Sequence, residues 1–129
     1  MVVVLRNIAI FGFMIIASGC TTVQQSDGGN WLGFTESGLA SFYGDKYQNR
    51  KSASGERYRH ELKTAAHRTL PFGSNVKVTN MSNNKSVVVT INDRGPFVKG
   101  RIIDLSKSAF NAIGNTSAGL LEVDIEVVP

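Results

Sequence analysis

The sequence predicts a mainly β protein, a small β-barrel with one clear helix, on three observations. Beyond position 36, the apolar residues fall into several short runs of the kind that form strands, many of them rich in valine and isoleucine. One segment has the spacing of an amphipathic helix. The chain has thirteen glycines, and several of them separate these runs, as tight turns require. Many short strands joined by such turns are typical of a barrel.

The first half of the expected barrel contains three strands. Gly38–Tyr43 is apolar and stops at Gly44, and a polar loop follows it. Val76–Thr79 alternates between apolar and polar residues, which predicts a strand with one buried face. After a turn at 80–84, Ser86–Ile91 is a continuous β-branched run, so we expect a central strand that is buried on both faces.

The second half contains two strands and the helix. Arg101–Asp104 is a short strand, and Ser106–Ile113 is the expected helix. Asp104 or Ser106 can cap the helix N-terminus, and Gly114 can end it. In the last strand apolar and acidic residues alternate, so the apolar ones are expected to face the core. The inward residues are Leu121, Val123, Ile125 and Val127, and the outward ones are Glu122, Asp124 and Glu126.

The N-terminus predicts a bacterial lipoprotein signal. Arg6 precedes an apolar run, Ile8–Ile16, which has the length of a signal-peptide core and is shorter than the ~20 residues of a bilayer span. The small residues 17–19 then lead to Cys20, the only cysteine in the chain. Small residues before a cysteine resemble a lipobox, although Ala17 stands where leucine is usual. We therefore expect lipid on Cys20; the alternative is an uncleaved hydrophobic anchor with an unrelated cysteine.

These features divide the chain into a signal peptide (1–19), a lipid-anchored flexible linker (20–36) and a barrel domain (37–129). Within the linker, Trp31 and Phe34 are expected to pack onto the domain. Cleavage would leave 110 residues, enough for one small domain, and no cysteine for a disulfide. We expect the protein at the periplasmic side of the bacterial envelope. Thr21 after Cys20 favours the outer membrane over the inner one.

The charge balance and the missing motifs exclude several classes of function. Thirteen Lys and Arg face ten Asp and Glu beyond Arg6, and they form no basic run, so nucleic acid binding is not expected. The two histidines, His60 and His67, have no cysteine nearby and make no zinc site. No phosphate-binding loop and no G-x-S-x-G motif is present. We expect no cofactor or metal.

Three polar residues are candidates for chemistry, each with a structural alternative. Asp93 follows an apolar strand and precedes a forced turn, so it could line a groove or simply bond the turn backbone. His67 follows small residues and could be a base or a satisfied core or surface residue. Glu56 lies in a polar loop and could be catalytic or only solvated. From spacing alone these alternatives stay open.

Six motifs taken together resemble the rare lipoprotein A family, a family of septal ring lytic transglycosylases. They are Gly38-Leu-Ala-Ser-Phe-Tyr-Gly44, Ser54-Gly-Glu-Arg-Tyr58, Thr64-Ala-Ala-His-Arg-Thr-Leu-Pro-Phe-Gly73, Val76-Lys-Val-Thr-Asn80, Ile91-Asn-Asp-Arg-Gly-Pro-Phe97 and Gly100-Arg-Ile-Ile-Asp-Leu-Ser106. The resemblance extends over about 38–127. It implies a six-stranded double-psi β-barrel with one or two short helices, and a groove that binds peptidoglycan glycan strands.

The resemblance also implies a reaction and roles for named residues. Such enzymes cut the β-1,4 bond between N-acetylmuramic acid and N-acetylglucosamine without water, and prefer peptide-free strands. Asp93 is expected to act as acid and then base, with His67 and Glu56 positioning substrate or tuning Asp93. Three further residues are expected at the substrate, namely Tyr43, Thr64 and Arg94. Asp104 is expected to be a helix cap.

Two other functions remain as alternatives. An expansin-like barrel would bind peptidoglycan without cutting it, and a structural lipoprotein would have no affinity for sugar. Many members of the family carry a SPOR domain after the barrel, and this chain ends at Pro129, so septal targeting by that route is not expected. We expect a monomer that is held at the membrane only by its lipid.

Overall fold

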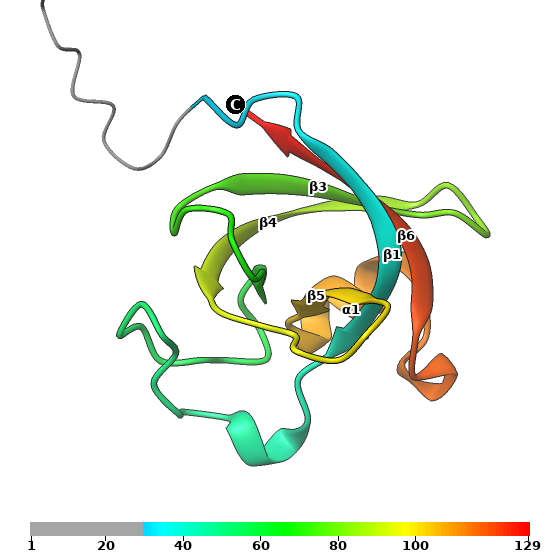
Figure 1. Cartoon of the computed structure of the whole chain (residues 1–129). Helices are drawn as coiled ribbons and strands as arrows, with labels where there is room; N and C mark the ends of the chain where they lie inside the picture. Colours follow the sequence, from blue (N-terminus) through cyan, green and yellow to red (C-terminus); the bar gives the residue numbers. More distant parts are fainter. Residues whose placement is uncertain (1–29) are drawn as a thin grey trace, which may run out of the picture.

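The computed structural model describes residues 30–129, and the expected signal peptide, Cys20 and linker residues 20–29 lie outside this part. Six strands close into a barrel in the order β1-β5-β2-β4-β3-β6 (Figure 1). They are β1 (Thr35–Phe42), β2 (Thr64–Ala66), β3 (Asn75–Asn80), β4 (Ser86–Asp93), β5 (Arg101–Leu105) and β6 (Leu121–Val128). The helical elements are α1 (Lys107–Ile113) and two 3-10 turns, η1 (Asp45–Tyr47) and η2 (Thr116–Ala118).

The barrel mixes parallel and antiparallel pairs. β1 runs parallel to β5, and β2 runs parallel to β4. The other neighbours are antiparallel, including β6, which pairs with both β1 and β3. The ends of β1, β4 and β5 lie on one side of the barrel. The loop 45–63 lies next to these ends, below the barrel in Figure 1. This arrangement positions the candidate site.

The core is built by alternation along the strands. Val76 and Val78 of β3 and Ile125 of β6 are almost fully buried, as their inward positions require. Helix α1 packs against β4, β1 and β5 and contributes Phe110, whose ring lies 4.7 Å from that of Phe42 between centroids. Each such buried side chain contributes ~1.5–3 kcal/mol to stability by leaving water.

Ser106 is the N-cap of helix α1. This corrects the expected role of Asp104. The Ser106 hydroxyl accepts the Ala109 N–H, which is the usual bond of an N-cap. Phe110 O accepts the N–H of Gly114 at the C-terminal end. Asp104 is the residue opposite Ser41 on the β1–β5 pair and does not cap the helix. The stripe predicted for the helix, Ala109, Phe110 and Ile113, is buried.

Three strands differ from their expected form. β1 begins at Thr35, so Thr35 and Glu36, which the sequence had placed in the linker, belong to the barrel. β4 is not buried on both faces: Val88 is 50% exposed, because no layer of structure covers this outward position. β2 was missing from the strands predicted from the residues, because it is only three residues long and two of them are alanine. It forms between β4 and β5 through tertiary pairing.

The segment just before β1 also packs as expected. Trp31 and Phe34 contact the core, and their ring centroids lie 5.2 Å apart in an edge-to-face arrangement. The Gly33 N–H donates to Val127 O, and the Val127 N–H donates to Phe34 O. These two backbone bonds hold this segment to β6. Among residues 30–129, we find no helix with the length and apolar character needed to cross a bilayer.

Candidate active site

Asp93 ends β4 and is fixed by three hydrogen-bond donors. Its Oδ1 accepts the backbone N–H groups of Ala53 (2.8 Å) and Arg94 (2.9 Å). Its Oδ2 accepts the Tyr43 hydroxyl at 2.6 Å. The Arg94 bond is the turn interaction expected of an aspartate before a break, but the other two join distant segments. The carboxylate is therefore held in one orientation at the end of the strand.

Tyr43, which directly follows β1, is a permanent hydrogen donor to this carboxylate. Burial, the hydrogen bond to Asp93 and the negative charge of Asp93 all raise the pKa of the Tyr43 phenol far above its usual range. Its ring lies against that of Tyr58, with centroids 4.3 Å apart. The phenol consequently stays protonated across the working pH range, and its orientation is set by ring packing.

Asp104 is the second carboxylate of the site, and sequence reasoning missed it. The Ser41 hydroxyl and Arg101 Nη2 both donate to Asp104 Oδ1, the latter at 3.1 Å. Asp93 and Asp104 line one cavity of about 200 Å³, which we call the Asp93 pocket. Its lining residues are Phe42, Tyr43, Tyr47, Asp93, Arg94, Arg101 and Asp104. A carboxylate inside an apolar strand needs a partner, and Arg101 three residues earlier was the available signal.

His67 is buried away from the Asp93 carboxylate. Its Nδ1 accepts the backbone N–H groups of Thr69 and Leu70, both at 3.1 Å, so a neutral ring carries its hydrogen on Nε2. Nε2 lies 2.9 Å from Oε1 of Glu36 on β1. The link to Asp93 runs through the backbone, where the His67 N–H donates to Asp93 O at 3.1 Å. His67 therefore positions the loop 67–70 and the end of β4.

Arg94 lines the pocket, but its guanidinium binds backbone carbonyls of the protein itself. Its Nη1 donates to Leu70 O (2.8 Å) and His67 O (3.3 Å), and its guanidinium lies 4.0 Å from the centroid of the Phe72 ring. The guanidinium thus binds carbonyls of the 67–70 loop, whose conformation His67 sets. It also packs against Phe72, whose side chain is half-exposed.

The other two predicted residues do not line the pocket. Glu56 is exposed on the turn 52–56, the same turn that presents the Ala53 N–H to Asp93. Thr64 is buried on β2, and its hydroxyl has no hydrogen-bond partner within residues 30–129. The structure therefore brings together Asp93, Tyr43 and Arg94 from the predicted set. Glu56 lies on the neighbouring turn 52–56, and His67 and Thr64 are buried outside the pocket.

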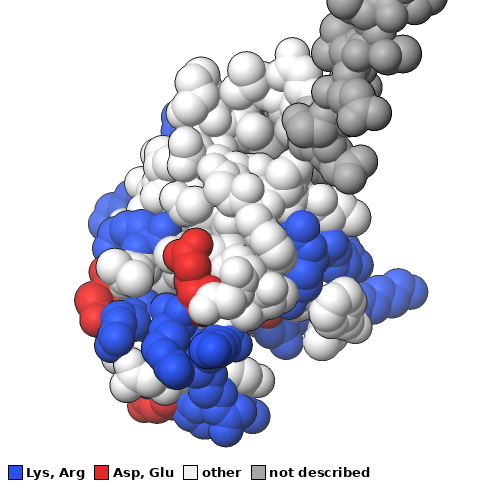
Figure 2. Space-filling model, turned by 90° about the vertical axis from the view of Figure 1, so that its left-hand side faces the viewer, with Lys and Arg blue, Asp and Glu red and all other residues white. Residues whose placement is uncertain are grey.

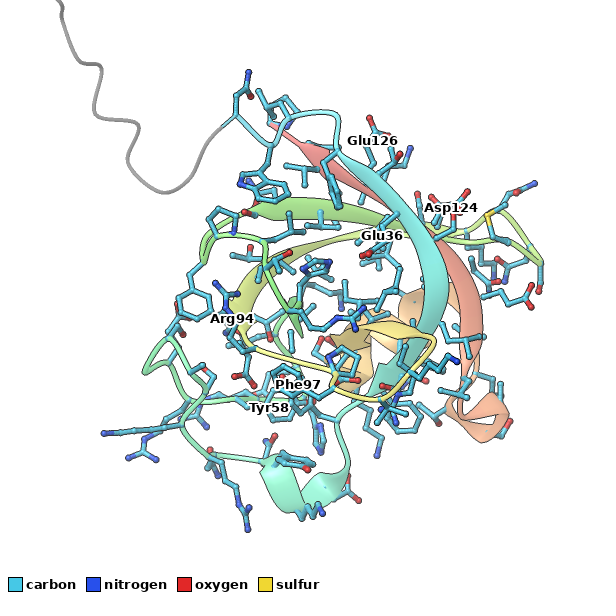
Figure 3. The ribbon with its side chains drawn as sticks, viewed as in Figure 1. Glu36, Tyr58, Arg94, Phe97, Asp124 and Glu126 are labelled. Carbon is cyan, nitrogen blue, oxygen red and sulfur yellow. The ribbon has the colours of Figure 1, made fainter. Side chains whose placement is uncertain are left out.

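Phe97 is the most exposed large aromatic side chain near the pocket. It is 79% exposed and follows Gly95, whose φ of +129° favours glycine. A side chain at Gly95 would meet Asp104 and the Phe97 ring, each at under 4 Å, so that ring borders the Asp104 side of the pocket. Tyr58, Arg94 and Phe97 gather on one side of the barrel, far from Asp124 and Glu126 on β6 (Figure 3).

Another groove, of about 410 Å³, lies on the β1–β6–β3 face, and its lining includes Lys77, Asp124 and Glu126. Although larger than the Asp93 pocket, it holds no fixed carboxylate pair beside a protonated phenol. Among residues 30–129, no three His, Cys, Asp or Glu side chains are grouped so that they could hold a metal ion. The Asp93 pocket itself contains two carboxylates and a phenol hydroxyl, groups that can transfer protons and stabilise positive charge.

A closed six-stranded barrel with two parallel pairs and this pocket defines a double-psi β-barrel protein, as the sequence had predicted. The chain belongs to the lytic transglycolase family, whose model matches residues 35–125. The family expected from the motifs is thereby confirmed.

Similar proteins carry a consistent name. The chain is 53% identical over 96 residues to a Pasteurella multocida protein named endolytic peptidoglycan transglycosylase RlpA, which covers 74% of this chain and 33% of that protein. A Vibrio cholerae protein of the same name is 56% identical over 99 residues, covering 77% of this chain and 38% of that protein. A Synechocystis protein named as a probable RlpA is 56% identical over 91 residues, covering 70% and 28%. This chain thus spans about a third of its curated relatives.

Solved structures confirm the fold alone. A Streptomyces papain inhibitor superposes with a TM-score of 0.63 at 20% identity, covering 76% of this chain and 97% of the inhibitor. An expansin from Clavibacter michiganensis superposes with a TM-score of 0.58 at 22% identity, covering 74% of this chain and 50% of the expansin.

Proposed function

We propose that this chain is an endolytic peptidoglycan lytic transglycosylase that cuts between N-acetylmuramic acid and N-acetylglucosamine. The observation that carries the proposal is the pair Asp93 and Asp104 in one open pocket, with Asp93 aligned by three donors. Relatives more than half identical over this domain bear the name of that activity, which supports the same substrate class. The substrate is a glycan strand, preferably free of stem peptides.

In the proposed reaction, Asp93 begins as the acid. It gives its proton to the glycosidic oxygen as the bond from that oxygen to C1 of the muramic acid breaks. Positive charge develops on the sugar ring, and the Asp104 carboxylate across the pocket stabilises it. Asp93 then takes the proton of the same sugar's 6-hydroxyl, whose oxygen bonds to C1. The product is a 1,6-anhydro end. The donated proton leaves on the hydroxyl of the released sugar, and the proton taken from the 6-hydroxyl returns Asp93 to its acid form.

The surrounding residues support this cycle without joining it. The Tyr43 hydroxyl donates a hydrogen bond to the Asp93 carboxylate and orients it. His67 holds the 67–70 loop, and through it the Arg94 guanidinium. Glu56 lies exposed on the turn 52–56, where it could contact a bound strand. Thr64 is buried on β2, so any contribution of Thr64 to substrate binding is indirect.

Digestion of purified peptide-free glycan strands tests the proposal, with products identified by mass spectrometry. We expect new 1,6-anhydro ends, and none when Asp93→Asn replaces the wild type. Binding without new ends would instead support the expansin-like alternative. The appearance of ordinary reducing ends would make the protein a hydrolase. A chain that does not sediment with peptidoglycan at all would favour a structural lipoprotein.

We also propose that lipid on Cys20 holds the barrel at the periplasmic side of the envelope, preferably at the outer membrane. The support is the apolar run Ile8–Ile16, followed by small residues and a single cysteine. Two or more acyl chains would give stable anchoring. Labelling of cells with a radioactive fatty acid should mark the wild type and not Cys20→Ala. Equal labelling of both proteins would contradict the assignment.

A further inference from the structure

A cationic rim borders the Asp93 pocket at Tyr47. The Tyr47 ring is one wall of the pocket and is 37% exposed. Against this same ring lie the Lys46 ammonium, 5.1 Å from the centroid, and the Arg50 guanidinium, 5.9 Å from it. Two positive charges therefore stand at the edge of the cavity that holds Asp93. We call Lys46 and Arg50 the Tyr47 cations.

The loop that carries these cations is fixed by hydrogen bonds. Asn49 and Arg50 exchange backbone bonds with Tyr58, each 2.8 Å long. The Arg57 and Arg59 guanidinium groups both donate to Asn49, to its backbone O at 2.8 Å and to its side-chain Oδ1 at 2.6 Å. These bonds hold Asn49 at a positive φ of 67°. The positions of the Tyr47 cations are thus preorganised relative to the pocket.

Their charge is not cancelled locally. Within residues 30–129, neither Lys46 nor Arg50 forms a salt bridge. The adjacent carboxylate, Asp45, is engaged by Lys107 at 3.2 Å and His60 at 2.9 Å. Residues 45–63 hold six Lys and Arg and three Asp and Glu. Figure 2 shows basic side chains gathered in the lower half of the molecule, where this loop lies in Figure 1.

We propose that the Tyr47 cations form an anion-binding subsite for the free lactyl carboxylate of a muramic acid unit in the pocket. This inference rests on the proposed function, which places such a unit beside Asp93. The lactyl carboxylate is three bonds from its sugar ring, so a ring beside Tyr47 brings it to the rim. When a stem peptide is attached, this carboxylate becomes a neutral amide, and the attraction is lost. The subsite would therefore select peptide-free strands.

Binding in an Asp93→Asn background, where strands are not cut, tests the subsite by isothermal titration. The probes are peptide-free glycan oligosaccharides with free lactyl carboxylates, and the same oligosaccharides converted to methyl amides. We expect the free acid to bind about tenfold more tightly at low salt. The preference should fall to about twofold or less in Lys46→Gln/Arg50→Gln. It should persist in the matched control Lys77→Gln/Lys85→Gln, which removes two charges from β3 and its turn.

Several outcomes would overturn the subsite. They are equal binding of acid and amide, a preference that survives Lys46→Gln/Arg50→Gln, and no binding of either probe. Strands that retain stem peptides should bind like the amide, and binding as tight as that of the free acid would assign the charge to peptide carboxylates instead. With the wild-type protein, anhydro ends formed from acid and amide with the same kcat/KM would leave the proposed reaction standing while the subsite fails. Cation-dependent binding without anhydro ends would do the reverse.

Discussion

Two carboxylates of this barrel, Asp93 and Glu36, have contrasting surroundings. Asp93 accepts its bonds from Tyr43, Ala53 and Arg94 and still lines an open cavity that it shares with Asp104. Glu36 instead accepts from the ring of His67, a residue only 3% exposed. The other ring nitrogen of His67 is occupied by two backbone N–H groups. The first arrangement presents a carboxyl group to a ligand, whereas the second stabilises a loop.

Residues in the motifs of one family can therefore have different roles. His67 and Asp93 both stand out in the sequence, and their backbones are hydrogen-bonded to each other. Only the Asp93 side chain faces the pocket. Substitutions at the two positions should therefore affect different quantities, namely the rate of cleavage and the stability of the fold.

Asp93→Asn should have the largest effect. The amide keeps the shape and can still accept hydrogen bonds, but it cannot cycle a proton, so cleavage should fall about a thousandfold. The midpoint of thermal unfolding should stay close to that of the wild type. Initial rates of anhydro-end formation and a melting curve measure the two effects. Cleavage at more than a tenth of the wild-type rate would remove Asp93 from the mechanism.

Asp104→Asn should come next, with a loss of about a hundredfold in cleavage rate, because a preorganised charge facing the sugar ring is removed. The side-chain amide oxygen of this variant would still accept from Ser41 and Arg101, so substrate binding should change little. Comparing kcat with KM separates the two contributions. An increase in KM with kcat unchanged would make Asp104 a binding group alone.

His67→Ala should lower stability more than chemistry. It leaves the N–H groups of Thr69 and Leu70 without their acceptor, at a cost of ~2 kcal/mol, which is about thirtyfold in the folding constant. Glu36→Gln keeps an oxygen acceptor for His67 and serves as the mild control. Urea unfolding gives the free energy of unfolding. A fully stable His67→Ala protein without activity would instead place His67 in the chemistry.

Tyr43→Phe should reduce cleavage by about tenfold, because Asp93 loses one charge-assisted hydrogen bond while the ring packing remains. Since the pKa of the Tyr43 phenol is raised far above its usual range, this residue should contribute no alkaline limb to the wild-type pH profile. Rates measured between pH 5 and about 10 check both statements. A limb that disappears in Tyr43→Phe would contradict the second.

Asp45→Asn should have the smallest effect, and it depends on pH. Hydrogen bonding and attraction from Lys107, followed by the bond to His60, lower the pKa of Asp45 below its ordinary 3.8. Because the folded pKa is the lower one, the stabilisation is present above the unfolded pKa and disappears as pH falls through the folded one. Melting curves should therefore differ slightly at pH 7, and the difference should shrink as the pH falls through the folded pKa of Asp45. A difference that grows on acidification would reverse the sign.

Much of the barrel could be predicted from the sequence, because five strands and the helix carry strong local patterns. β2 could not, since three residues with two alanines among them are too short a signal for a strand, and the segment pairs only with β4 and β5 on either side. The burial predicted for Val88 was wrong for a related reason: a β-branched run does not reveal which face of a strand is covered.

The residues of the site were likewise only partly predictable from the sequence. Asp93 could be found because it follows an apolar strand and precedes a forced turn. Asp104 was assigned to a helix cap because capping is a local rule, whereas its partner Ser41 lies 63 positions away in the sequence. The Tyr47 cations are equally invisible in sequence, since their closeness to Asp93 depends on how the loop 45–63 folds back onto the barrel.

We propose that the Asp93 pocket cleaves glycan strands without water. This can be tested by digestion in water enriched in oxygen-18, followed by mass spectrometry of the new muramic acid ends. We expect unlabelled ends that are lighter by one water than a hydrolytic end, since the sugar's own 6-hydroxyl closes onto C1. Ends that carry oxygen-18 and have the mass of a hydrolysis product would contradict it.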